Sequence, residues 1–155
     1  MTDRIQNLID MGRLLRDEAG DEEVAGLWSN ALEAFADASV TGISAAGRLV
    51  RAYDAGRLAA AALVRSRDLR VRAANHHEIT LVAASFTSSG DLEVALGDLQ
   101  DLRTLRSAAE YGWQMSVSDD DAEDALAVVR RVIQGGAHNL QEHRPAIAAR
   151  IQTID

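Results

Sequence analysis

The chain has 155 residues, of which 47% are hydrophobic but only 4% aromatic, and it carries a net charge of −8 and no cysteine. Its length suits a single domain, and its acidity argues against a protein that coats nucleic acid through its overall field. The lack of cysteine excludes disulfide bonds, thiolate metal sites and a cysteine nucleophile.

The N-terminal region predicts two helices and no targeting segment. Charged residues interrupt residues 1–20 throughout, which argues against a secretory signal, and no stretch reaches the roughly 20 apolar residues of a membrane span. We therefore expect a cytoplasmic protein without membrane contact. Apolar residues at helical spacing predict a first helix over residues 2–18, which Gly20 ends, and a second helix that Asp21 caps and that continues through Phe35.

The middle of the chain predicts three further helices. Ser44 is the expected N-cap of a long helix over residues 45–64, whose small residues let a partner helix come close. A basic segment with four arginines between residues 65 and 72 follows, and then a shorter helix over residues 77–86. A central helix is expected over residues 91–113.

The last third of the chain predicts one strong helix and a weaker final segment. Ser118 and Asp121 have the spacing of a capping box, and the helix that they begin carries an apolar face until Gly135 and Gly136 end it. Pro145 is expected near the first turn of the final segment. Together the elements predict an all-α fold, a single antiparallel bundle of five to seven helices with short connections.

The central helix places charged residues on an otherwise apolar face. Arg103, Arg106 and Glu110 follow one another at spacings of three and four residues, in line with Leu99 and Leu102. A buried guanidinium needs a partner, because burying it alone is costly. The base precedes the acid in Arg106 and Glu110, the reverse of the favoured order, so this pair alone contributes only about 0.2–0.5 kcal/mol. Without further information, an ion pair that fixes packing is the simplest interpretation.

A characteristic order of features runs from Ser44 to Ile133. It comprises a long Ala-rich helix with a Tyr (AYDAGRLAAAAL), a basic loop, a His before a short helix (NHHEITLVAASF), a helix that ends in LRTLRSAAEYG, and the acidic start of a further helix (SVSDDDAEDALAVVRRVI). In this order the features resemble a HEPN domain (higher eukaryotes and prokaryotes nucleotide-binding), a small all-α module of bacterial and archaeal conflict systems. We accordingly divide the single domain, residues 1–155, into an N-terminal helical extension (1–40), a HEPN-like core (41–134) and a C-terminal helical segment (135–155).

The similar HEPN subgroup ends its central helix in Arg, a short spacer, Ala, an acidic residue and Tyr. Arg106, Ala109, Glu110 and Tyr111 match this pattern. Of the two adjacent histidines His76 and His77, either could match the upstream His of the family, and His77 fits better by its distance to Phe86.

Many HEPN proteins are metal-independent ribonucleases that act as homodimers, with a His a few residues beyond the Arg. Here Tyr111 stands five residues after Arg106, and no His follows until His138. The resemblance implies that Arg106 stabilises the charge that develops on phosphorus, with His77 in place of the missing His and with Glu110 and Tyr111 beside it. Tyr111 would be a poor base, since its unperturbed pKa is about 10.

The resemblance also implies partners. A HEPN-like protein of toxin-antitoxin or defence type would bind RNA or a nucleotide in the cleft of a homodimer, beside an antitoxin or a nucleotidyltransferase that could modify Tyr111. Arg103, Arg70 and Arg72 are the expected contacts to phosphate, because arginine grips phosphate bidentately. The basic segment that holds Arg70 and Arg72 could equally be a solvated loop.

Two alternatives remain from other classes. The chain could be a catalytically silent helical module for protein-protein interaction, in which Arg106 and Glu110 are structural and the acidic surface binds a basic protein. A metal- or cofactor-dependent enzyme finds little support, because His76 and His77 would point about 100° apart on a helix and the sequence has no Gly-rich phosphate loop. We therefore expect neither a metal nor a cofactor.

Overall fold

The computed structural model describes residues 2–72, 76–111 and 116–155. In these residues the chain forms six α-helices, one 3-10 helix and one small sheet, so the predicted all-α bundle is confirmed. No helix among them is long and apolar enough to cross a membrane. The elements are, in chain order, α1 (Thr2–Asp10), β1 (Leu14–Arg16), α2 (Asp21–Ala38), α3 (Ala45–Arg65), β2 (Leu69–Val71), α4 (His76–Phe86), α5 (Gly90–Tyr111), α6 (Asp119–His143) and the 3-10 helix η1 (Pro145–Arg150).

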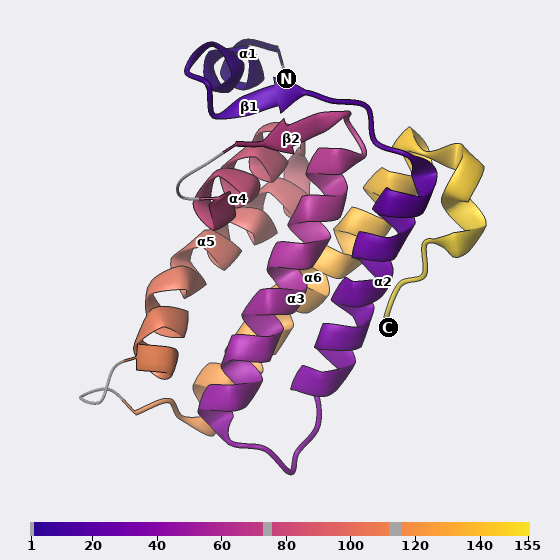
Figure 1. Cartoon of the computed structure of the whole chain (residues 1–155). Coiled ribbons are helices and arrows are strands. Elements are labelled where there is room, and N and C mark those ends of the chain that lie inside the picture. The colour runs from indigo at the N-terminus through magenta and orange to yellow at the C-terminus, as the bar shows by residue number, and fades with distance from the viewer. Residues whose placement is uncertain (1, 73–75, 112–115) are drawn as a thin grey trace.

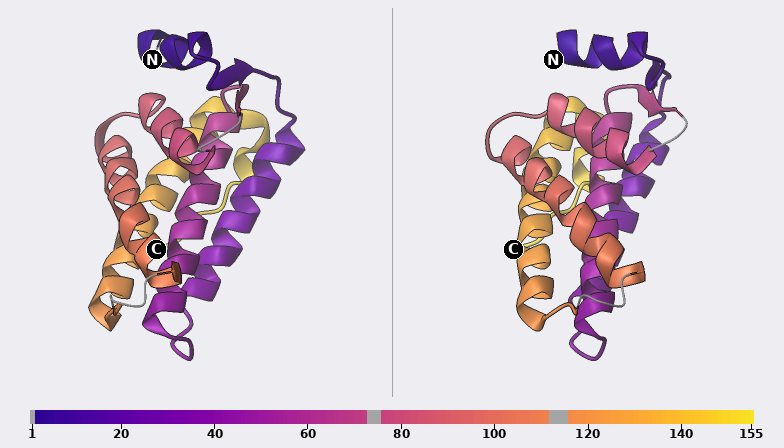
Figure 2. Two further views of the ribbon diagram at one scale, coloured as in Figure 1. Left: turned by 60° about the vertical axis from the view of Figure 1, so that its left-hand side comes forward. Right: turned by 90° about the vertical axis from the view of Figure 1, so that its left-hand side faces the viewer.

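Helix α3 is the central element of the bundle, because it packs against α2, α4, α5 and α6 (Figure 1). Helix α5 crosses the bundle at an angle to α3, with α4 at its N-terminal end (Figure 2). The strands β1 and β2 pair at the end of the bundle where α1 also lies, and the C-terminal segment returns along α2. The surface formed by α3, α4 and α5 therefore combines residues from three separate parts of the chain.

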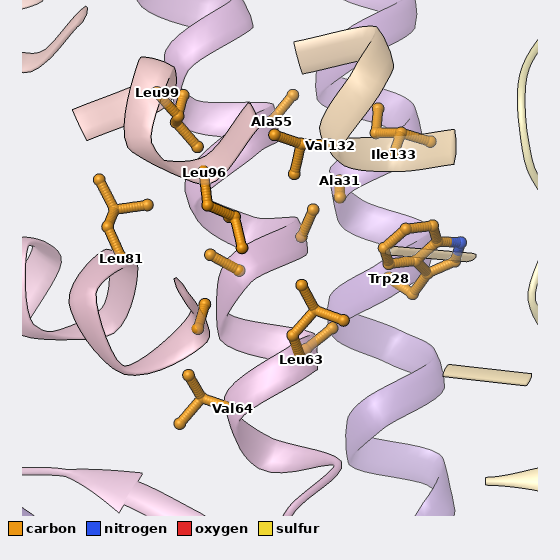
Figure 3. Packing of buried hydrophobic residues seen from close by; sticks show 14 of the residues in the cluster. Trp28, Ala31, Ala55, Leu63, Val64, Leu81, Leu96, Leu99, Val132 and Ile133 are labelled. Carbon is orange, nitrogen blue, oxygen red and sulfur yellow. The ribbon is translucent and has the colours of Figure 1, made fainter. Parts of the chain in front are cut away.

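The core consists of apolar side chains from α2, α3, α4, α5 and α6, with many alanines among them (Figure 3). Small residues on α3 let α5 approach closely, as the sequence predicts. At Gly56 an added Cβ would lie only 2.7 Å from Leu99 Cδ2. This close approach brings the charged face of α5 next to Tyr53 and Asp54 of α3.

Several predicted helix starts are confirmed by their hydrogen bonds. The Ser44 hydroxyl accepts a hydrogen bond from the Gly47 backbone N–H at 3.1 Å. Ser118 and Asp121 form both halves of the capping box, at 3.0 and 2.9 Å. Pro145 lies in the first turn of η1.

The prediction for the first segment is wrong beyond Asp10. Gly12 has a φ of +72°, a conformation that glycine adopts without strain, and it turns the chain out of α1. Residues 14–16 then form β1, which pairs antiparallel with β2, inside the segment predicted as a basic loop. Gly20, not Asp21, is the N-cap of α2.

The prediction that Gly135 and Gly136 end a helix is also wrong, because α6 continues to His143. Both glycines serve packing instead. An added Cβ at Gly136 would lie 3.0 Å from Trp28 Cη2, and one at Gly135 would lie 3.1 Å from Leu92 Cβ. The boundary placed after residue 134 therefore falls inside a continuous helix.

Candidate functional site

A cavity of about 560 Å³ opens between α4 and α5, next to Tyr53 of α3. Seven of its residues carry hydroxyl, imidazole or guanidinium groups that can donate a hydrogen bond to an anion or be protonated to do so, and they come from three helices. The lining residues are Tyr53, His76, His77, Glu78, Arg103, Thr104, Arg106 and Ser107. Spacings of three and four residues place Arg103, Arg106 and Ser107 on the same face of α5. The structure thus brings Arg103, Arg106 and His77 together, as the resemblance implies.

Arg106 is held between two carboxylates at this cavity. Its Nη1 lies 2.5 Å from Glu110 Oε2, and its Nη2 lies 3.9 Å from Asp54 Oδ1. The guanidinium carbon is 5.8 Å from the centre of the Tyr53 ring, within the range of a cation-π contact. Its Nε is buried and has no hydrogen-bond partner among the described residues. The predicted pair with Glu110 is therefore confirmed, and it leaves one donor of Arg106 unsatisfied.

Arg103 and Glu78 form a salt bridge between α5 and α4 at the rim of the cavity. Arg103 Nη1 lies 2.9 Å from Glu78 Oε2, and both side chains are about half exposed. An exposed pair of this kind contributes only about 0–1 kcal/mol. Arg103 can therefore exchange this partner for another at little cost.

Tyr53 of α3 lines the cavity and Arg57 of α3 lies behind it, and neither was among the site residues predicted from the sequence. Tyr53 is only 2% exposed, and within the described residues its hydroxyl has no hydrogen-bond partner. Burial raises its pKa, against the opposing influence of Arg103, Arg106 and Arg57. Arg57 lies one turn along the same face, with a buried Nε that lacks a partner in the described part of the chain. A tyrosine within the apolar stripe of an Ala-rich helix, with an arginine four residues on, was the available signal.

His77 lies at the exposed rim, where its neighbours favour the neutral imidazole. Partial burial lowers its pKa below the ordinary value of 6.5, and the charges of Arg57, His76 and Arg106 lower it further, whereas Asp54 opposes them. At neutral pH this side chain is therefore uncharged and able to accept a proton.

We predict that His77 titrates below the ordinary histidine range and that this makes the fold sensitive to acid. The unfolded chain binds a proton at His77 at a higher pH than the native protein does, so the stability due to the neutral ring is present above pH 6.5 and is lost as the pH falls through the native pKa. Titration of the ring proton signals by NMR measures the pKa directly. Arg57→Met should shift it upward, and an unchanged pKa in that variant would contradict the contribution assigned to the Arg57 charge, leaving burial as the cause.

The other predicted residues are placed differently. Arg70 lies on β2, and its Nε is 2.7 Å from Asp17 Oδ2, away from the cavity lining. Arg72 is exposed just after β2, and its backbone N–H donates to the Arg13 carbonyl. Tyr111 is the last residue of α5, but its side chain lies outside the described part of the structure, as does Trp113. The structure thus leaves the roles predicted for Arg72 and Tyr111 as predictions.

Neither a metal site in the described residues nor a related protein adds to this description of the cavity. Within the described ranges, no group of three or more His, Asp or Glu side chains is placed to hold a metal ion. Comparisons of the chain with protein-family models, with curated proteins and with solved structures gave no match.

Proposed function

We propose that this chain is a HEPN-like protein of toxin-antitoxin or defence type that binds a phosphate group of RNA or of a nucleotide in the cavity between α4 and α5. The observation that carries the proposal is a surplus of buried donors in the wall of the site and directly behind it. Arg57 Nε, Arg106 Nε and the Tyr53 hydroxyl all lack a hydrogen-bond partner in the described structure. Each unsatisfied buried donor costs about 1–3 kcal/mol.

A phosphate group fits this surplus because its oxygens only accept hydrogen bonds, and an arginine fork matches two of them. The three donors are covered in the free protein, so the side chains that bear them would have to rotate toward the ligand. Arg106 and Arg103 line the cavity, and the charge of Arg57 lies behind it, close enough to affect Tyr53 and His77. A ligand phosphate would therefore meet the guanidinium groups of Arg103 and Arg106 and lie in the field of a third, that of Arg57.

The same residues support a proposal of weak, metal-independent cleavage of RNA. His77 is neutral at pH 7 and could take the proton of the attacking ribose 2′-hydroxyl, while Arg106 would stabilise the charge on phosphorus as the bond to the 5′-oxygen breaks. An acid has to protonate that leaving oxygen. In a homodimer whose two copies face each other across this surface, a second His77 in its protonated form would supply that proton, which is why we place the site in a homodimer cleft.

The alternative, a silent interaction module, draws support from the ion pairs of the site. Arg103 is paired with Glu78 and Arg106 with Glu110, so both arginines have a structural role in the free protein. In that module, however, the partners would satisfy the arginines. The Nε atoms of Arg106 and Arg57, which have no hydrogen-bond partner in the part of the chain that the structure describes, favour a binding site.

The proposal is tested by titrating a fluorescently labelled single-stranded RNA of mixed sequence with purified protein in EDTA. We expect wild type to bind and Arg106→Ala to bind at least about tenfold more weakly, since hydrogen bonds to charged groups contribute about 1.5–3 kcal/mol. His77→Ala should reduce any cleavage more than binding. Arg131→Ala is the matched control, because Arg131 pairs with Asp98 outside this cavity.

Two results would count against the proposal. If wild type neither binds nor cleaves RNA at high protein concentration, the RNA reading fails and the interaction module becomes the better account. If Arg106→Ala and Arg131→Ala lose affinity equally, binding reflects general charge and not this cavity. Thermal unfolding of each variant shows whether it is folded in the assay.

A further inference from the structure

Glu110 is paired with Arg106, the arginine that a ligand phosphate would need. We propose that Glu110 is an internal competitor, which holds Arg106 in the free protein and is replaced on it by a phosphate group of the ligand. This inference rests on the proposed function and concerns the regulation of the same site.

The geometry of Arg106 supports an exchange of partners. Glu110 contacts only Nη1, at 2.5 Å, and lies one turn beyond the residues that line the cavity. The Nε of Arg106 stays buried without a partner, and Asp54 is 3.9 Å from Nη2. In this arrangement the guanidinium presents no complete fork to the cavity. A rotation that releases Glu110 would free two adjacent N–H groups for a bidentate contact.

The pair of Arg106 and Glu110 is weak enough to be exchanged. It joins positions i and i+4 of one helix in the less favoured order, and the two side chains are 20% and 33% exposed. Pairs of this type contribute only about 0.3–0.5 kcal/mol. A phosphate group brings more acceptor oxygens than the carboxylate, and it could also satisfy donors that the free protein leaves unpaired.

The charge balance of the cluster explains why such a competitor matters. Arg57, Arg103 and Arg106 are balanced by three carboxylates, those of Asp54, Glu78 and Glu110. With His77 neutral, the site has no net positive charge, and the whole chain carries −8. A phosphate is therefore not drawn in by a strong field, and its affinity depends on displacing a carboxylate from an arginine.

The experiment compares three variants in the RNA titration described above. Glu110→Gln removes the charge of the competitor, and Glu110→Asp keeps the charge but shortens the side chain so that it no longer reaches Arg106. Asp98→Asn removes one charge from α5 outside the cavity lining, where Asp98 pairs with Arg131 at 2.5 Å. We expect Glu110→Gln to bind RNA about threefold more tightly than wild type, which is the gain that releasing a pair of this strength allows, and Glu110→Asp to bind more tightly as well. Asp98→Asn should change affinity by less than about twofold.

Each outcome decides between the proposals. If wild type binds RNA and Glu110→Gln binds it no more tightly, Glu110 is not a competitor and the proposed function stands. If Glu110→Gln is tighter but Glu110→Asp equals wild type, the gain comes from net charge alone and the competitor role is excluded. If none of the proteins binds RNA, the proposed function itself fails. Tighter binding by both Glu110→Gln and Glu110→Asp than by wild type supports both.

Discussion

Arg57→Met is expected to weaken RNA binding about tenfold while leaving the protein at least as stable as wild type. Arg57 has no ion pair among the described residues, and its buried Nε has no hydrogen-bond partner there, so its charge stabilises the free protein little. Methionine retains most of the apolar stem and removes the unsatisfied group. A bound phosphate would lose one of the charges near it. Opposite effects on stability and on binding are typical of a residue kept for a ligand.

The measurement combines the RNA titration with urea unfolding of the same samples. Arg150→Met is the matched control, because Arg150 is exposed and its Nη1 pairs with Glu22 Oε1 at 2.9 Å, away from the cavity lining. We expect that control to change binding and stability only slightly. If Arg57→Met bound RNA like wild type, or unfolded at clearly lower urea concentration, Arg57 would be a structural residue and not part of the site.

Local signals in the sequence were sufficient for most of the helices. Helix starts are indicated by Ser44, Ser118 and Asp121, because a side-chain cap is a contact within one turn. The apolar stripes of α2, α3 and α6 repeat over several turns, so their period is unambiguous. These features depend only on residues close together in the chain.

The errors arose where distant residues decide the local structure. Residues 14–16 become a strand because residues 69–71, more than fifty positions later, offer them a partner. Gly135 and Gly136 continue a helix because their lack of a side chain admits Leu92 and Trp28 from other helices. Glycine has a low helix propensity, and no local pattern could show that packing outweighs it.

The candidate site was predictable along α5 but not across helices. Arg103, Arg106 and Glu110 share a face by spacing alone, and the structure confirms the pair that this spacing suggested. Tyr53 and Arg57 join them only because α3 and α5 cross at Gly56. Arg70, by contrast, belongs to a network with Asp17 that the sequence separates by 53 positions. The structure shows Arg70 in an ion pair, and its contact to phosphate stays a prediction.

Trp28 packs against Gly136. The effect of Gly136→Ala on the free energy of unfolding should therefore change sign when Trp28 is removed. Trp28 is fully buried, and its Nε1–H donates to the Gln152 carbonyl at 2.7 Å, so Trp28→Ala should lower the free energy of unfolding by about 3–5 kcal/mol. Gly136→Ala should also destabilise wild type, by about 1–3 kcal/mol, because its Cβ would meet the Trp28 ring at 3.0 Å.

In the Trp28→Ala background the same Gly136→Ala change should stabilise the protein by about 0.5–1 kcal/mol, because the ring is gone and alanine is the better helix former. Urea unfolding of the four proteins gives the coupling free energy between the two positions. Gly26→Ala serves as the control, since Gly26 is exposed on α2 and an added Cβ there meets nothing within 4 Å. It should stabilise both backgrounds equally. If Gly136→Ala were destabilising in both, the glycine would be needed for the backbone of α6 and not for contact with Trp28.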